Sequence, residues 1–446
     1  MPIIVWLPQY KWREDFIPDL LAGITTAFIH VPQGLAFAML AQVTPIFGLY
    51  TACFSTLVYC FFGTAQVGSF GPVAVASMLI GEAVAVNSGT DGYMNNEIAS
   101  ALTLNIGAIY VIAFLLRLGV LASVFIKPFT SGFVTGCAVH IVVKVLRPML
   151  GLHMKPVYGF LNLFYNYHNV ATALGHILAV NTGIFRPFLK RYTRFILPIE
   201  VVVMAISIAL SHWLDFAGMG IAVVGTVPTG LPAVILPSLG ASSFLWGPAV
   251  VVAAINYSTT TSMTLMFNRK LDPNQELLAL GVSNLLCCNL SCISIGNSMM
   301  RTVIAVSVGT RTLISSIVSC IILFFVILFM GPVFSPLPDC VLGAILMIGV
   351  VMLIIGQLKD VPKFFKTSIE DTFIWGATLG AVLLANIDYG LIVGIVLSLR
   401  KILGERDVSI QQQKKKDEEG DVAATNDEKE ERLPLNHAPS SNKELV

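Results

Sequence analysis

Residues Thr312–Met330 read TLISSIVSCIILFFVILFM, and residues Cys340–Gly356 read CVLGAILMIGVVMLIIG. Neither stretch contains a charged side chain. A membrane-spanning helix needs about 20 mostly apolar residues, whereas a membrane strand would appear as a shorter segment of alternating hydrophobicity. Because both runs are long and continuous, they predict helices that cross a lipid bilayer.

The composition of the whole chain agrees with a membrane fold. The 446 residues are 55% hydrophobic and only 12% charged, about half the charged fraction of a soluble domain. Residues 405–446 hold 7 of the 27 basic and 11 of the 26 acidic residues. Residues 1–404 therefore carry too little charge to cover a soluble surface. This composition excludes a water-soluble enzyme, a secreted disulfide scaffold and a general nucleic-acid binder.

The distribution of basic loops predicts the topology. The apolar part of the chain is long enough for roughly 12 to 14 spans, and basic connections mark the cytoplasmic side. Three connections are basic: Arg186–Arg194, Arg269–Lys270 and Lys359–Lys366. The connection Asn87–Glu97 has acidic residues and no basic one, so it should face outward. A fold of about 14 helices with both termini in the cytoplasm places all four connections on their predicted sides of the membrane.

Three parts follow from this topology. Residues 1–16 are expected to form a cytoplasmic N-terminal segment, residues 17–404 a transmembrane transporter domain, and residues 405–446 a disordered cytoplasmic tail. The tail has too few apolar residues to fold. The first residues are polar and charged rather than apolar, so no cleavable signal peptide is expected.

Two apolar segments are short and open with helix-breaking or polar residues. One begins at Gly71-Pro72 and runs to Gly81, and the other begins at Gly296-Asn297-Ser298 and runs to Gly309. Short, interrupted segments at corresponding positions of two halves are typical of transporters built from inverted repeats. We therefore expect an all-α polytopic protein with two half-helices that meet near the midplane.

Arg301 is the only ionised residue of the apolar stretch Cys292–Val308. A charge at bilayer depth costs at least about 2.5–3.5 kcal/mol and marks a pathway or a site by default. Arg301 also falls in the first turns of a half-helix, whose free N–H groups and dipole favour an anion. The residue predicts a site for a halide or a small oxyanion. The alternative is an arginine that reaches the interface or pairs with a carboxylate such as Glu82.

Further residues could complete this site. Val73 and Ala74 would begin the other half-helix after Gly71-Pro72, where free N–H groups point outward, although a simple helix start is the alternative. Gln33 could orient the substrate, or it could bond to a neighbour in a proline-kinked helix. Ser298 could add a polar lining. Ser258, in the polar stretch 256–262, could line a hydrated cavity, or its hydroxyl could bond back to its own helix.

No metal, cofactor or enzymatic activity is expected. Cys287, Cys288 and Cys292 lie close in sequence, but no His or carboxylate accompanies them to complete a metal site, and buried membrane cysteines explain them more simply. His30 and His140 are isolated and are expected to be structural. The sequence contains no Walker loop, dinucleotide fingerprint or nucleophile elbow.

Several motifs resemble the sulfate permease (SulP) family of anion transporters, which includes the pendrin- and prestin-like carriers. The motifs are Leu20-Leu21-Ala22-Gly23, Val31-Pro32-Gln33-Gly34, Pro45-Ile46-Phe47-Gly48-Leu49-Tyr50-Thr51, Gly71-Pro72-Val73-Ala74-Val75 and Thr226-Val227-Pro228-Thr229-Gly230-Leu231-Pro232. The resemblance extends over about residues 8–400.

The resemblance implies fourteen spans in two inverted seven-span repeats, with a core domain that moves against a gate domain, and it implies a homodimer. Substrate anions would bind between the third- and tenth-span half-helices. The residues that match the family's site are Gln33, Phe37, Val73, Ala74, Ser298 and Arg301.

The sequence departs from the family pattern at several positions. Met300 stands where the family has a serine before the arginine, and Val73 where many animal members have an aromatic residue. Ile255 occupies the place of a membrane acid in proton-coupled members, which argues against proton symport. Family members usually end in a folded cytoplasmic STAS domain, and the polar tail does not resemble one, so we expect the chain to lack it.

The predicted function is secondary-active exchange of small inorganic anions (sulfate, chloride, bicarbonate, oxalate) by alternating access, in a multi-pass protein of the plasma membrane. Two alternatives remain open. One is an anion channel or a voltage-responsive anion-binding membrane protein, since an arginine between helix ends would also serve a pore. The other is a non-transporting partner or regulator.

Overall fold

The computed structural model describes residues 1–89, 92–149, 199–267, 271–385 and 387–404. The predicted basic connections at Arg186–Arg194 and Arg269–Lys270, and the tail at residues 405–446, lie outside this part of the chain. The chain divides into two compact units, Met1–Ile395 and Val396–Val446. The helices and strands named below lie in the first unit.

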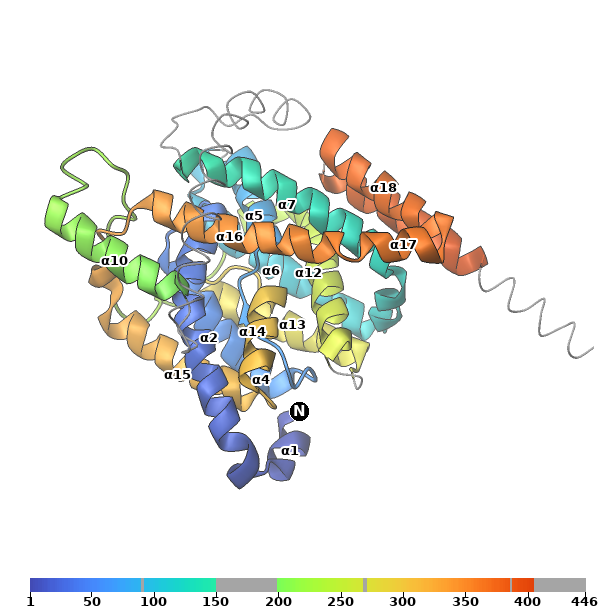
Figure 1. Cartoon of the computed structure of the whole chain (residues 1–446), viewed down its shortest axis with the longest axis horizontal. Helices are drawn as coiled ribbons and strands as arrows, with labels where there is room; N and C mark the ends of the chain where they lie inside the picture. The colour runs from blue at the N-terminus through green and yellow to red at the C-terminus, as the bar shows by residue number, and fades with distance from the viewer. Residues whose placement is uncertain (90–91, 150–198, 268–270, 386, 405–446) are drawn as a thin grey trace, which may run out of the picture. The chain divides into compact units, whose positions relative to one another are not determined.

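Helices make up most of the described chain (Figure 1). The first group, in chain order, is α1 Ile3–Trp6, α2 Trp12–Leu40, α3 Ile46–Tyr50, a π-helical turn Thr51–Ser55, α4 Thr56–Phe62, α5 Ala74–Asn87, α6 Asn95–Leu115, a 3₁₀ segment Leu118–Val124 and α7 Lys127–Met149. The second group is α10 Ile199–Leu214, α11 Leu239–Phe244, α12 Trp246–Phe267, α13 Pro273–Cys287, α14 Met299–Val308, α15 Ile314–Phe329, α16 Asp339–Leu358, α17 Val361–Thr367 and α18 Ile369–Leu384.

The charge-free runs form helices as predicted. Thr312–Met330 contains α15, and Cys340–Gly356 lies within α16. Four helical stretches of the described residues are long and apolar enough to cross a membrane, Trp12–Leu40, Asn95–Leu115, Lys127–Leu146 and Asp339–Lys366, while α5, α14 and α15 are apolar but shorter. The all-α polytopic prediction therefore fits, and the number of spans stays a prediction.

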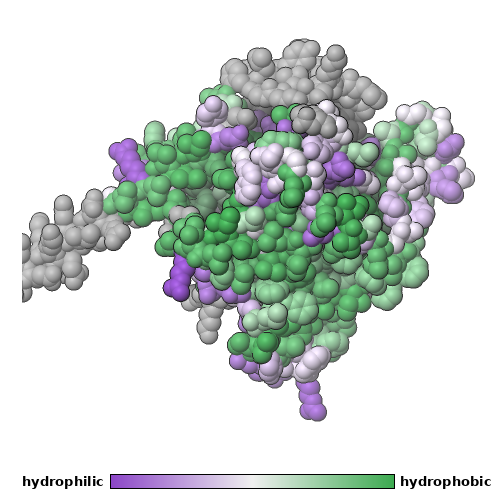
Figure 2. Space-filling model, turned by 180° about the vertical axis from the view of Figure 1, so that it is seen from behind, coloured by the Kyte–Doolittle hydropathy of each residue, from purple (hydrophilic) through white to green (hydrophobic). Residues whose placement is uncertain are grey.

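Apolar side chains remain exposed along these helices. Figure 2 shows hydrophobic residues over much of the visible face. On α15, Ile321, Phe325 and Phe329 are 54%, 58% and 71% exposed. Such surfaces are costly in water, and they fit a lipid environment.

Two short strands join the halves of the chain, an element that the all-α prediction did not include. β1, Phe70–Gly71, pairs antiparallel with β2, Gly296–Asn297, with Phe70 opposite Asn297 and Gly71 opposite Gly296. Each strand leads within a few residues into a short helix: β1 into α5, and β2 into α14. The pair therefore brings the first turns of the two predicted half-helices together.

Helices from the two halves of the chain also pack against each other. α14 packs against α2 and α5 packs against α12, while α15 packs against α2 and α12 against α6. α7 packs along α16 and α18, and Figure 1 shows α7 and α16 side by side. The candidate site lies where α2, α5 and α14 meet.

Candidate functional site

The N-termini of α5 and α14 are both uncapped. Val73 precedes α5 and Ser298 precedes α14, each in an extended conformation and each without a side-chain hydrogen bond to its helix. The first backbone N–H groups of a helix have no partner within it. Two adjacent uncapped N-termini therefore present a set of free donors together with the positive ends of two helix dipoles. Val73 and Ala74 are half-buried, so these donors are not sealed off.

Arg301 extends from the first turn of α14 between these helices. It is only 1% exposed. Its Nη1 donates to Gln33 Oε1 at 3.1 Å, and its Nη2 donates to the Pro72 carbonyl at 2.9 Å. Its Nε has no hydrogen-bond partner among the described residues. The guanidinium is thus fixed between α2 and the start of α5 and retains an unused donor.

The alternatives for Arg301 do not fit this geometry. A side chain that is 1% exposed does not reach an interface. Glu82 pairs instead with Lys144, at 3.6 Å, and none of the ion pairs found in the described part of the chain includes Arg301. Within that part, the charge of Arg301 is held by neutral acceptors rather than by a carboxylate.

One face of α2 lines the site. Gln33 accepts a hydrogen bond from Arg301, and the Arg301 guanidinium carbon lies 5.9 Å from the centre of the Phe37 ring. Residues three and four positions apart share a helix face, so His30 lies on the same stripe as Gln33 and Phe37. His30 is 2% exposed, and its Nε2 lies 3.2 Å from Ser69 Oγ. The sequence predicts a structural role for His30, and its spacing from Gln33 and Phe37 places it on the helix face that lines the candidate site.

Ser258 lies elsewhere. It lines a small cavity with Phe125, Phe129 and Ile255, and its hydroxyl has no partner among the described residues. Thr260, two positions later on α12, contacts β2, where its hydroxyl accepts a hydrogen bond from the Asn297 backbone N–H at 3.2 Å. Side chains two apart on a helix point in nearly opposite directions. The structure therefore brings Gln33, Phe37, Val73, Ala74, Ser298 and Arg301 together, and it does not bring Ser258 to them.

A polar network holds the two strands in place, and the sequence did not predict it. Thr302 Oγ1 donates to Asn297 Oδ1 at 2.7 Å and accepts from the Ser69 N–H at 3.0 Å. The Ser298 N–H donates to the Ser69 carbonyl at 3.1 Å. The two bonds to Ser69 connect residues more than 200 positions apart, so no local pattern reveals them. They fix α14 relative to the chain that precedes α5.

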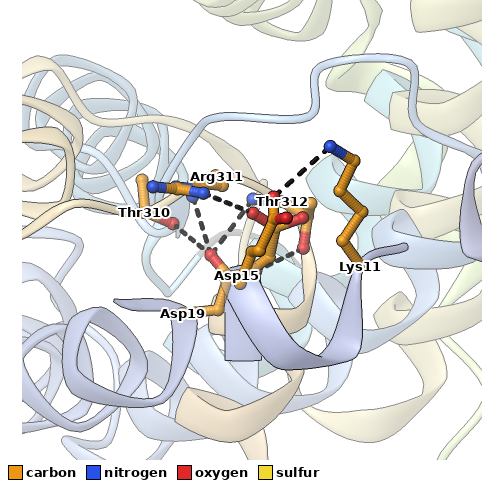
Figure 3. Close-up of polar contacts among 7 residues, drawn as sticks. Lys11, Asp15, Asp19, Thr310, Arg311 and Thr312 are labelled. Carbon is orange, nitrogen blue, oxygen red and sulfur yellow. Dashed lines mark hydrogen bonds and ion pairs between the residues drawn. The ribbon is translucent and has the colours of Figure 1, made fainter. Parts of the chain in front are cut away.

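The far end of α14 is fixed by Asp19 of α2, which is fully buried (Figure 3). Its carboxylate accepts hydrogen bonds from the Arg311 N–H at 2.7 Å, the Thr312 N–H at 3.1 Å and the Thr312 hydroxyl at 2.6 Å. Arg311 also forms an exposed ion pair with Asp15, at 2.7 Å. The loop after α14 is therefore attached to α2.

In the part of the chain that the structure describes, the cysteines and histidines form no metal site. Among the described residues, no group of three or more His, Cys, Asp or Glu side chains lies close enough to bind an ion. Cys287, Cys288 and Cys292 are buried free thiols. His140 is bonded to the Val382 carbonyl at 3.0 Å.

The chain is similar to known membrane transporters. The sequence profile of the sulfate permease family matches residues 16–378. The chain is 32% identical to prestin of Danio rerio and 30% identical to human solute carrier family 26 member 6, over 90% of this chain in both cases. The alignments cover 59% and 56% of those proteins, so this chain spans about three fifths of their length.

Solved structures agree on the fold. Murine solute carrier 26 family member A9, an anion transporter solved in the inward-facing state, superposes with a TM-score of 0.81 and 25% identity over 91% of this chain and 71% of that one. The transmembrane domain of the cyanobacterial bicarbonate transporter BicA superposes with a TM-score of 0.69 and 22% identity over 85% of this chain and 97% of that domain. By sequence and by fold, the chain belongs to the sulfate permease family, whose members are transporters and not enzymes.

Proposed function

We propose that this protein exchanges small inorganic anions (sulfate, chloride, bicarbonate and oxalate) across the plasma membrane, as a secondary-active transporter working by alternating access. The anion would bind between the first turns of α5 and α14. Arg301 would supply the positive charge. The backbone N–H groups that follow Val73, beginning with Ala74, and those that follow Ser298 would be the donors of the two helix starts, and Gln33 and Phe37 would form the wall on α2.

The observation that carries this proposal is the charge balance at Arg301. A buried guanidinium with no carboxylate partner in the described residues leaves a net positive charge in a low-dielectric site. Such a charge is strongly unfavourable unless an anion offsets it. The adjacent uncapped helix starts have the same electrostatic preference.

Contacts between the two halves of the chain support an alternating mechanism. The antiparallel pairing of β1 with β2, and the packing of α14 on α2 and α5 on α12, are the contacts expected of two inverted seven-span repeats. The similarity to an anion transporter and to a bicarbonate transporter supports the substrate class. We extend the proposal to fourteen spans, cytoplasmic termini, a transmembrane domain at residues 17–404 and a homodimer.

Anion counterflow in proteoliposomes tests the proposal. Vesicles loaded with unlabelled sulfate and reconstituted with the full chain should accumulate labelled sulfate, chloride or oxalate. Arg301→Gln should reduce this exchange at least about tenfold, because loss of one charged hydrogen bond costs about 1.5–3 kcal/mol. Arg400→Gln, at an exposed arginine, is the matched control and should retain wild-type exchange.

Two outcomes would contradict the proposal. If Arg301→Gln exchanges anions as fast as the wild type, the assignment of the site is wrong. If uptake of label does not require an anion inside the vesicle and follows the membrane potential, the protein is a channel rather than an exchanger.

A further inference from the structure

His30 is a buried titratable residue to which the proposed anion site assigns no role. One ring nitrogen, Nε2, lies 3.2 Å from Ser69 Oγ, while Nδ1 has no hydrogen-bond partner in the described part of the chain. The residue is 2% exposed. An unpaired buried polar atom is rare, and it calls for a reason such as a ligand.

The unpaired edge of the ring faces the candidate site. A Cβ added to Gly71 would lie 2.8 Å from His30 Cε1, 3.3 Å from His30 Nδ1 and 3.3 Å from Arg301 Nη2. The imidazole and the guanidinium therefore approach the same point on the backbone, directly before the start of α5. Gly71 has φ +147°, a conformation that favours glycine, and the absence of a side chain permits this close approach.

The charges around His30 are few. Among the described residues, the charge that acts on the ring is that of Arg301, from α14. The other elements packed against α2 carry few titratable groups. Glu82 of α5 is paired with Lys144, and α15 has no charged residue. The remaining groups are Asp339 on α16, Glu200 and His212 on α10, Tyr50 on α3 and Cys53 on the π-helical turn.

We propose that His30 is a specificity-determining residue of the anion site, which takes up a proton when a doubly charged oxyanion binds and so shares that anion with Arg301. This inference rests on the proposed function. An imidazolium beside the Arg301 guanidinium is unfavourable without an anion, because two positive charges repel at short range. A dianion offsets both charges, whereas chloride offsets only one.

Binding of the proton and binding of the dianion are therefore coupled. The proton is taken from water on the side where the dianion enters, and it is given to water on the side where the dianion is released. Coupling is reciprocal, so the affinity for sulfate or oxalate rises as pH falls, while the affinity for chloride changes little. His30 would thus supply the protonatable group that α12 lacks at Ile255.

Equilibrium binding of labelled sulfate and labelled chloride to the purified full chain tests the inference. The measurement runs from about pH 5.5 to 8, the range in which a histidine changes charge. For the wild type, sulfate affinity should fall with rising pH, at most about tenfold per pH unit for one coupled proton. His30→Gln, which keeps a polar side chain next to Ser69, should bind sulfate with little pH dependence. His140→Gln, at a half-buried histidine that is hydrogen-bonded to a carbonyl of α18, is the control and should keep the wild-type profile.

A second measurement uses the wild type, so it does not require that a variant folds. Sulfate is added to the wild type in weakly buffered solution that contains a pH indicator. At a pH near 7 the protein should take up about one proton for each sulfate that it binds. When chloride binds instead, the protein should take up almost none. Equal proton uptake for both anions, or a His30→Gln variant with the wild-type pH profile, overturns the inference and leaves the proposed function intact. A wild type that binds neither anion overturns both.

Discussion

The hydrogen bond between Arg301 and Gln33 is the contact through which a single substitution can change the charge of the candidate site. Arg301 donates to a neutral amide oxygen, at 3.1 Å, rather than to a carboxylate. A neutral acceptor orients the guanidinium and leaves its charge available to an anion. The chemistry of the site thus depends on the amide of Gln33 as much as on the charge of Arg301.

Gln33→Glu should therefore weaken anion binding about 10- to 100-fold, because an internal carboxylate would pair with Arg301 and compete with the anion. The dissociation constant for sulfate, measured by equilibrium binding, checks this. Gln275→Glu makes the same change in the first turn of α13, where it removes the hydrogen bond to the Phe62 carbonyl, at 2.9 Å, and touches no residue of the candidate site; it should leave binding unchanged. Equal affinities in Gln33→Glu and the wild type would show that the pair does not control the site.

Gly71→Ala tests the close approach of the backbone to Arg301 and His30. Alanine at this positive φ is strained by about 1–3 kcal/mol, and its methyl group would also collide with the His30 ring, at 2.8 Å. The variant should melt at a lower temperature and lose most of its anion binding. Gly89→Ala shares the positive φ but has no atom within 4 Å in the described structure, so it should lose some stability and no binding. If both variants lost the same amount of stability and of anion binding, the assignment of Gly71 to the candidate site would be contradicted.

At the scale of the elements, α14 is a ten-residue helix held at both ends. β2 and its partner β1 fix the start, and Asp19 of α2 fixes the loop after its end (Figure 3). Short helices gain little stability from their own hydrogen bonds. The position of Arg301 therefore depends on these two attachments.

Asp19→Asn should destabilise the protein by about 2–3 kcal/mol, because the new amide N–H₂ would face donors that now reach a carboxylate. We also expect faster proteolysis after Arg311 and weaker anion binding, since α14 would be held at one end only. Asp15→Asn removes only the exposed ion pair with Arg311 and should have a much smaller effect. Thermal melting and limited proteolysis in detergent compare the two; an Asp19→Asn protein as stable as Asp15→Asn would contradict this role.

Local signals explain what could be predicted from the sequence. The charge-free runs marked α15 and α16, and Gly71-Pro72 and Ser298 marked the starts of the two short helices. The orientation of the polar side chains on α12 was harder to predict, because this helix is largely buried. The sequence did not indicate that Asn256 and Thr260 face β2 while Ser258 faces away. The pairing of Ser69 with Thr302 is non-local, and no pattern in the sequence predicted it.

At the scale of the whole molecule, a cavity of about 460 Å³ lies between α5, α12 and residues Ile387 and Asp388. Glu82 lines this cavity and forms an ion pair with Lys144 of α7, at 3.6 Å. Both side chains are partly buried, at 22% and 25% exposure. The pair links α5, which begins at the candidate site, to α7, which packs along α16. If α5 moves relative to α7 during transport, this contact changes in each cycle.

Reversal of one charge tests this link. Glu82→Lys would place two ammonium groups close together in a partly buried position and should destabilise the protein by about 1–2 kcal/mol and slow exchange. The double variant Glu82→Lys with Lys144→Glu restores opposite charges and should recover most of both losses. Melting temperatures and counterflow rates of the three proteins check this prediction, and a double variant no better than Glu82→Lys would show that the pair has no such role.

The most direct measurement of the central claim is the position of a bound anion. Crystals of the full chain grown with bromide in place of chloride allow the ion to be located by its anomalous scattering. We expect a peak between the first turns of α5 and α14, next to Arg301 and within reach of the backbone N–H groups after Val73 and Ser298. Ordered bromide found only at other positions, with none between these two helices, would contradict the account.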